Sequence, residues 1–271
     1  MKCGLIREAD GHFGIHWMNR KERIMMNKSV MNESIQLMYD RKSVRVFEEK
    51  EIPSECKTAI LKAAVNAPTA GNQQLYTILD ITDQNVKEQL VKTCDNQPFI
   101  AKAKMVLIFC ADCQKWYDAF LDTDCTPRKP GVGDLLLAVS DTVIAAQNAV
   151  MAAESLGIGS CYIGDIMENC EIHREMLHLP EYVFPAAMLV FGYPTEQQKR
   201  RIKPERADMQ YIVHENYYHE MDKETRKGLF SKKAVERSYE DWMQAFCNRK
   251  FNSDFSREMT RSVSEYLKNF E

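Results

Sequence analysis

The chain has 271 residues, of which 45% are apolar, and its 36 Lys and Arg against 39 Asp and Glu give a formal net charge of −3. This balance excludes a generally basic nucleic-acid binder, and the length suffices to bury a sizeable core without disulfides or metal ions. No stretch approaches ~20 consecutive apolar residues, so the sequence predicts no transmembrane helix and no membrane partner.

The first residues of the chain show little periodicity. Residues 1–30 carry charges throughout and lack the apolar core of a signal peptide. We expect this segment to be an N-terminal extension, disordered or derived from cloning, and residues 31–271 to form a single domain. From Asn32 onward the hydrophobic pattern becomes regular.

The first half of this domain alternates helical and strand-like patterns. We expect helices over 33–39 and 52–66, a polar loop over 69–74, a strand over 75–82, a helix over 83–93 and a buried strand over 104–111. Asp83 stands where a helix N-cap belongs.

The strongest helix is predicted over 133–156, where apolar and small residues run almost unbroken. Such a helix is typical of a buried core, and its small residues also suit close packing across a dimer interface. The remaining expected elements are a strand over 158–164, a helix over 168–177, a strand over 184–193, a basic loop over 199–206 and helices over 232–246 and 254–269. Helices and strands mix without repeats, which indicates an α/β or α+β domain.

Nine cysteines, an odd number at scattered spacings, favour the reduced thiols of the cytoplasm over a disulfide framework. Cys110 and Cys113 form a C-x-x-C pair, but no second pair stands at zinc spacing. His214 and His219 stand one residue beyond the i, i+4 spacing of a zinc-binding helix, which favours loop or surface histidines. We therefore expect no metal ion.

Two basic segments stand out in this acidic chain, one at Arg41, Lys42 and Arg45 and the other at Lys203 and Arg206. Taken alone, each is typical of a solvated charged surface. Together with the polar loop they suggest an anionic ligand with one phosphate, held by converging guanidinium and ammonium groups. Nucleic acid would require a longer positive stripe with stacking aromatic residues.

Four motifs in order resemble those of the FMN-dependent nitroreductase family. They are the R-x-S-x-R pattern at Arg41–Arg45, the A-P-S-x-x-N-x-Q-like loop at Ala67–Gln74, the helix-to-strand segment Glu154–Gly164, and Gly192–Pro194 with the basic loop after it. The resemblance spans about residues 32–271, and stretches 145–149 and 213–216 are similar to the NADPH–flavin oxidoreductase branch, the oxygen-insensitive major nitroreductases. It implies an α+β nitroreductase-like fold, with a central, mainly antiparallel sheet flanked by helices, in an intertwined homodimer.

The resemblance also implies which residues bind FMN. The phosphate would be held by Arg41, Lys42, Ser43, Lys203 and Arg206. The flavin ring would be contacted by Arg45 near N1 and O2, by Gln97 at the pyrimidine edge, by Tyr162, Ile163 and the backbones of Gly164 and Asp165 near N5 and O4, and by Thr69, Gly71, Asn72 and Gln74 of the partner subunit. A cation at the position of Arg45 stabilises the reduced flavin. Asp165 departs from the family, which often has a second small residue there.

The implied activity is hydride transfer from NAD(P)H through flavin N5 to nitroaromatic, quinone or flavin acceptors by a ping-pong mechanism, with no protein nucleophile or metal ion. NADPH and NADH are both compatible donors. Two alternatives stay open: a flavoenzyme of the same fold with a dedicated substrate, such as a dehalogenase, and a flavin-binding protein without turnover. A nucleic-acid-associated factor that uses residues 199–206 is a weaker hypothesis, because other basic runs are scarce.

Overall fold

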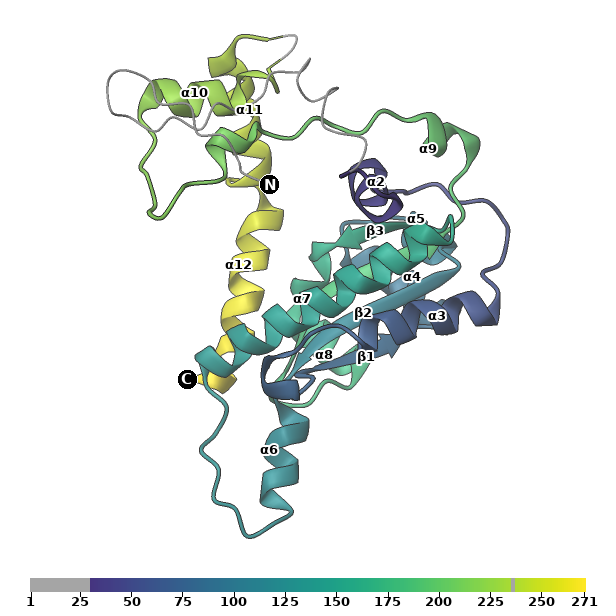
Figure 1. Ribbon diagram of the computed structural model, residues 1–271. Helices are drawn as coiled ribbons and strands as arrows, with labels where there is room; N and C mark the ends of the chain where they lie inside the picture. Colours follow the sequence, from purple (N-terminus) through teal and green to yellow (C-terminus); the bar gives the residue numbers. More distant parts are fainter. Residues whose placement is uncertain (1–29, 235–236) are drawn as a thin grey trace, which may run out of the picture. The chain divides into compact units, whose positions relative to one another are not determined.

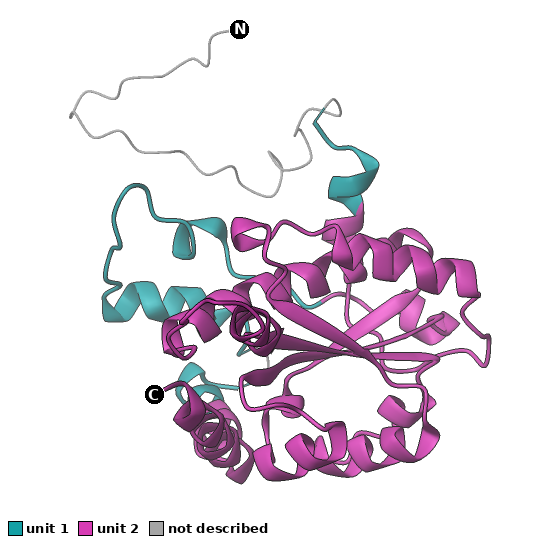
Figure 2. Ribbon diagram, turned by 90° about the horizontal axis from the view of Figure 1, so that it is seen from below, with its two compact units in different colours: residues 1–36, 204–244 teal, residues 37–203, 245–271 magenta. Residues whose placement is uncertain are grey.

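The computed structural model describes residues 30–234 and 237–271. The chain divides into two compact units, one of Met1–Gln36 and Pro204–Gln244 and the other of Leu37–Lys203 and Ala245–Glu271 (Figure 2). The extension expected over 1–30 lies outside the described residues, apart from Val30. The single domain expected over 31–271 stays a prediction.

The larger unit is built on a four-stranded antiparallel sheet. Its strands are β1 (Tyr76–Asp80), β2 (Met105–Asp112), β3 (Gly159–Ile163) and β4 (Val183–Gly192), in the spatial order β1-β2-β4-β3 (Figure 1). The register places Ile78 opposite Phe109, and both Val106 and Cys161 opposite Val190. This sheet with its covering helices confirms the predicted α+β fold.

The two central strands, β2 and β4, are buried along their whole length. Because side chains alternate between the two faces of a strand, Leu107 and Phe109 of β2 enter one core with α3 (Ser54–Val65) and α7 (Val132–Ser155). Val106 and Ile108 enter a second core with α4 (Gln84–Thr93) and α5 (Phe99–Lys102). Cover on both faces explains why these strands are apolar at nearly every position, the exception being Asp112 at the end of β2.

Helix α7 has 24 residues and packs against α3 and the sheet. Ala145, Ala149 and Ala153 are fully buried on it, so the sheet approaches this face closely. By length and composition α7 is also apolar enough to cross a membrane, but 44% of its most apolar stretch is buried inside the protein. The core helix of a globular protein passes the same test, so α7 carries no membrane assignment.

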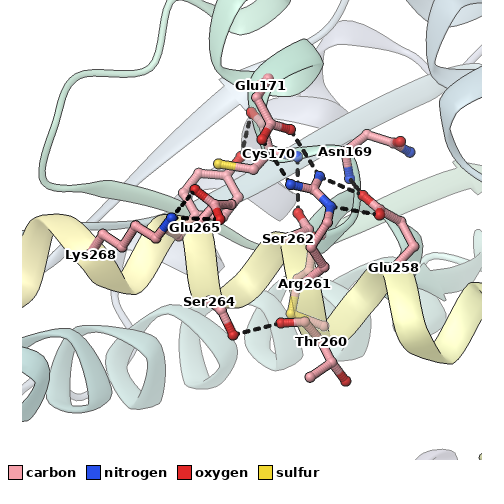
Figure 3. A network of polar contacts seen from close by, with 12 residues as sticks. Asn169, Cys170, Glu171, Glu258, Thr260, Arg261, Ser262, Ser264, Glu265 and Lys268 are labelled. Carbon is pink, nitrogen blue, oxygen red and sulfur yellow. Dashed lines mark hydrogen bonds and ion pairs between the residues drawn. The ribbon is translucent and has the colours of Figure 1, made fainter.

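The C-terminal helix α12 (Asp254–Leu267) is fixed by apolar and polar contacts. Tyr266 is fully buried, and its ring meets Phe184 edge to face with the centroids 5.0 Å apart. The Ser262 hydroxyl donates to Met167 O at 2.7 Å and accepts from Cys170 N at 2.9 Å. Figure 3 shows the polar network around this serine.

The other described elements are short. They are α2 (Glu33–Asp40), η1 (Ala70–Asn72), α6 (Gln114–Leu121), η2 (Gly164–Met167), α8 (Cys170–Leu177), α9 (Glu196–Arg200), η3 (Met209–Tyr211), α10 (Lys223–Ser231), α11 (Tyr239–Lys250) and η4 (Lys268–Phe270).

Two expected boundaries are corrected, and the helices α6 and α10 were not foreseen. The helix expected over 232–246 is α11, which begins only at Tyr239, because the Ser238 hydroxyl there accepts from Asp241 N at 3.0 Å. An unforeseen helix, α10, precedes it. The basic loop expected over 199–206 begins inside α9, and α6 was not foreseen from the hydrophobic pattern.

Candidate functional site

The first basic segment runs beside β3 and β4. Val44 N donates to Ser160 O at 2.9 Å. Two glycines make room for this approach: a Cβ on Gly159 would lie 2.5 Å from Val44 Cγ2, and one on Gly192 would lie 2.6 Å from Phe47 Cδ1. Glycine at these two strand positions therefore lets the arginine-bearing segment contact the sheet.

Lys42 and Arg201 join the first basic segment to the second. The Lys42 ammonium donates to Lys199 O and to Arg201 O, both at 2.6 Å, and Arg201 Nη2 donates to Ser43 O at 2.7 Å. These cations are bonded to backbone carbonyls, which orient them without neutralising their charge. The two segments thus form one positively charged cluster.

Arg41 gives the clearest sign of an anion at this cluster. Its Nε and Nη2 are buried and have no hydrogen-bond partner among the described residues. Its Cζ lies 5.8 Å from the centre of the Tyr162 ring. Arg41 also interacts with Glu154 of α7, whose pKa is raised by burial, while the charges of Arg41, Lys42 and Lys203 act in the opposite direction. A buried guanidinium with unused donors favours an incoming acceptor.

The second basic segment contributes Lys203 and Arg201 to this cluster. Lys203 Nζ donates to Tyr39 O at 2.6 Å and to Met38 O at 3.3 Å, next to Arg41 in the chain. Arg201 was not foreseen as a binding residue, and its place within a basic run was the only signal for it. Arg206 belongs to the smaller unit, so the structure does not place it relative to the cluster.

Arg45 is exposed at the end of the same segment. Its N–H donates to Oε1 of the buried Gln198 at 3.3 Å, and its Cζ lies 6.0 Å from the centre of the Phe99 ring. An open cavity of about 540 Å³ is lined by α9, including Gln198, and by Arg201. Gln198 is a second contributor that sequence reasoning missed.

The polar loop after α3 is organised by Asp141 of α7, a residue that the sequence analysis passed over. Its buried carboxylate accepts hydrogen bonds from the Thr69 hydroxyl and from Ala70 N, the latter at 3.0 Å. Thr69 Oγ1 accepts from Gln74 N at 2.8 Å, so this hydroxyl is directed into the protein. Gly71 and Asn72 form the exposed part of the loop. The only sequence signal for its anchor was an acidic residue in the middle of an otherwise mostly apolar helix.

Gln97 and Asp165 come together from different elements. Gln97 follows α4, and its Nε2 donates to Asp165 Oδ2 at 3.1 Å and to Cys94 O at 3.0 Å. Asp165 lies in η2, directly after the exposed Gly164. The side chain at this unusual position is therefore used to hold Gln97.

Tyr162 and Ile163 of β3 occupy different environments. The Tyr162 hydroxyl donates to Gln147 Oε1 at 3.3 Å, and burial raises the pKa of Tyr162 to about 12, so it stays protonated at neutral pH. Ile163 is buried in the core with Ile108 and Met188. The Ile163 side chain is thus enclosed by the core.

The minor motifs carry no further site. Burial raises the pKa of Cys110 and of Cys113 to about 12, so both thiols stay protonated. His214 lies in a loop and its Nδ1 accepts from His219 N at 3.0 Å. Within residues 30–234 and 237–271, no group of three or more His, Cys, Asp or Glu side chains is arranged to hold a metal ion.

The sequence model of the family described as "Nitroreductase family" matches residues 38–193, which include all four strands and the first basic segment. The chain belongs to the nitroreductase family. The resemblance inferred from the four motifs is thereby confirmed.

Relatives of this chain include the FMN reductase [NAD(P)H] of Bacillus subtilis, 29% identical over 87% of this chain and 91% of the relative. The oxygen-insensitive NADPH nitroreductase of Salmonella typhimurium is 35% identical over 71% of this chain and 77% of the relative. Among solved structures, the NADPH:FMN oxidoreductase of Vibrio harveyi complexed with NAD+ superposes with a TM-score of 0.75 at 25% identity, covering 87% of this chain and 98% of that one.

Proposed function

We propose that this nitroreductase is an NAD(P)H-dependent FMN oxidoreductase. The names of the relatives support this enzyme class, FMN as the cofactor and NAD(P)H as the donor. The structural observation that supports it best is Arg41, which lies in a cluster of carbonyl-oriented cations and has two buried guanidinium nitrogens without an acceptor in the described part of the chain. A phosphate monoester has the charge and the acceptor oxygens that such a cluster binds.

The residues present fit FMN. Arg41, Lys42, Ser43 and Lys203 would hold its phosphate, with Arg201 as an addition and Arg206 as a further candidate from the smaller unit. When bound, FMN supplies the acceptor and donor of hydride at N5. The protein residues then act on the ring: Arg45 presents a positive charge that favours its reduced, anionic form. Gln97, Tyr162, and the backbones of Ile163, Gly164 and Asp165 would fix its edge.

We propose that the nicotinamide donor and the acceptor use the site in turn, as a ping-pong mechanism requires. Nitroaromatic compounds, quinones and free flavin are the proposed acceptors. A dedicated substrate, such as a halogenated compound, and flavin binding without turnover are the alternatives. Turnover of one special acceptor much faster than of all others would favour the first alternative, and bound FMN that neither NADPH nor NADH reduces would favour the second.

We also propose a homodimer in which the loop of Thr69, Gly71, Asn72 and Gln74 completes the partner's site. Helix α7 supports this, because it leaves apolar side chains exposed, among them Leu136 at 62%. Light scattering should give twice the 31.4 kDa of one chain. Leu136→Glu should lower both that mass and FMN affinity, whereas a wild-type protein of 31.4 kDa that binds FMN would contradict the shared site. The described cysteines are all free, which supports a cytoplasmic location.

The deciding experiment tests Arg41 directly. Purified protein is titrated with FMN, and its absorption spectrum is recorded before and after anaerobic addition of NADPH. We expect bound flavin that bleaches on NADPH. Arg41→Ala should weaken FMN binding by about tenfold to a hundredfold, the loss of one or two charge-assisted hydrogen bonds.

Arg257→Ala is the matched control, because Arg257 is an exposed arginine of α12 that pairs with Asp254 of its own helix. It should bind FMN as the wild type does. If Arg41→Ala and Arg257→Ala bind FMN equally well, the phosphate does not lie at this cluster. If the wild type binds no FMN at any concentration tested, the proposed function is wrong.

A further inference from the structure

Glu168 is a buried carboxyl group that the proposed mechanism does not use. It directly follows η2, the turn whose first residues would meet the flavin ring, and its N–H donates to Asp165 O at 3.0 Å. The residue is 6% exposed, and Oε1 is buried with no hydrogen-bond partner among the described residues. An ionised carboxylate is unfavourable in such a place, because burial of an unpaired charge costs much more than burial of the neutral acid.

The charged groups that face Glu168 are all acidic. Asp165 comes from η2, Asp95 from the segment between α4 and α5, and Glu258 from α12. Burial first, and these three carboxylates next, raise the pKa of Glu168 to about 7. Near neutral pH the group therefore carries a proton for a substantial part of the time.

Among the residues that the structure describes, the neighbouring helices supply no positive charge that acts on Glu168. Arg261 of α12 is engaged by Glu171 at 2.8 and 2.9 Å and by Glu258 at 2.8 Å (Figure 3). His173 of α8 is fully buried, and burial lowers its pKa, which keeps it neutral. Burial also raises the pKa of Cys94 to about 12, so its thiol stays neutral as well.

The geometry links this carboxyl to the ring edge of the proposed site. Asp165 of η2 makes two hydrogen bonds. Its carbonyl accepts from Glu168 N, and its carboxylate accepts from Gln97 Nε2 at 3.1 Å. A second negative charge on Glu168 would repel the Asp165 carboxylate and disfavour this compact arrangement. Neutral Glu168 leaves it undisturbed.

We propose that Glu168 is a positioning residue which, in its protonated form, keeps η2 and the Asp165–Gln97 contact in the conformation that binds the FMN ring. Ionisation of Glu168 then weakens FMN binding. This inference rests on the proposed function, in which Gln97 and η2 contact the flavin. Glu168 touches neither the donor nor the acceptor.

The test measures the FMN dissociation constant of the apoprotein from pH 5.5 to pH 8.5, by fluorescence quenching. Wild type is compared with Glu168→Gln, which mimics the protonated acid, and with Glu55→Gln, an exposed carboxyl of α3, as control. The FMN phosphate titrates equally in all three measurements. The ratio of two dissociation constants therefore reports only the titration of groups in the protein. The ratio of wild type to Glu168→Gln should rise about tenfold between pH 6 and pH 8, because only the protonated fraction is competent.

The ratio of wild type to Glu55→Gln should stay constant. A constant ratio of wild type to Glu168→Gln, with FMN still bound, would overturn this inference and leave the proposed function standing. If neither the wild type nor the variants bind FMN, this inference and the proposed function are both wrong. Infrared spectra of the apoprotein give a second readout, since the carbonyl stretch of a protonated acid should disappear with rising pH in the wild type and be missing in Glu168→Gln.

Asp95→Asn keeps the inference testable if Glu168→Gln does not fold. It removes one of the carboxylates that face Glu168, so the loss of FMN affinity should begin at a lower pH than in the wild type. An unchanged midpoint would contradict the proposal.

Discussion

Asp141 shows how one buried carboxylate can shape a whole loop. It lies on α7 and is 3% exposed, and its oxygens accept hydrogen bonds from the Thr69 hydroxyl and the Ala70 amide. The loop beyond it has three left-handed residues, Gly71, Asn72 and Gln74, which need such external support. The conformation of this loop is therefore fixed by Asp141, a residue that is distant from it in the sequence.

Asp141→Ala should lower the free energy of unfolding by roughly 2–4 kcal/mol, because it leaves the loop's buried donors without acceptors. Urea denaturation measures this. Asp124→Ala, at an exposed loop position, is the control and should stay within about 0.5 kcal/mol of wild type. Equal stability of the two variants would show that water replaces the carboxylate at the loop.

At the scale of elements, the Ser262 hydroxyl joins α12 to two others, because it donates to Met167 O of η2 and accepts from Cys170 N of α8. Removal of its hydroxyl leaves both Met167 O and Cys170 N without this hydrogen-bond partner inside the protein. Ser262→Ala should therefore cost roughly 1–3 kcal/mol in the free energy of unfolding. Ser264 lies on the same helix but donates only to Thr260 O of its own turn (Figure 3), so Ser264→Ala should cost almost nothing. Thermal or urea denaturation of the two variants measures this difference in stability. Equal effects would exclude an anchoring role for Ser262.

The contact between the first basic segment and β3 depends on Gly159. In Gly159→Ala the new methyl group would overlap the Val44 side chain, so we expect a loss of roughly 1–3 kcal/mol in the free energy of unfolding and weaker FMN binding. Gly133→Ala in α7 is the control, because nothing lies within 4 Å of its Cβ. It should be neutral or stabilise the protein by up to about 1 kcal/mol, as alanine does in a helix. Equal melting temperatures for the two variants would contradict the close approach at Gly159.

At the scale of the whole molecule, Glu168 predicts how stability changes with pH. Its pKa rises from 4.5 in the unfolded chain to about 7 in the folded one. Between these values the folded chain keeps a proton that the unfolded chain releases, so the stabilisation is present below pH 4.5 and is lost as the pH rises to 7. The loss amounts to roughly 2–4 kcal/mol of unfolding free energy.

Glu168→Gln should therefore match the wild type near pH 4.5 and exceed its stability at pH 8. His173 acts in the opposite direction, because its lowered pKa removes stability as the pH falls below 6.5. The difference between variant and wild type cancels that contribution, and urea denaturation at both pH values measures it. A difference that does not depend on pH would mean that Glu168 titrates normally in the folded protein.

Much of this molecule was predictable from local pattern. The apolar runs within 104–111 and 184–193 predicted strands, because a strand covered on both faces is apolar almost throughout. The R-x-S-x-R segment and the loop at Ala67–Gln74 were recognisable because their residue types stand at the spacing of the family's motifs. Helix α10 and the late start of α11 were missed, since side-chain caps at Asp222 and Ser238 decide them and the apolar pattern does not.

The sequence by itself thus determined the fold class, the family and the presence of two basic segments. The tertiary structure alone decided which cations converge, because Lys42 and Arg201 are oriented by backbone carbonyls of distant segments. It also decided which carboxyl groups are buried: Asp141 and Glu168 look like ordinary acids in the chain. The burial of a side chain and the charges around it depend on packing, and packing depends on the arrangement of all the elements together.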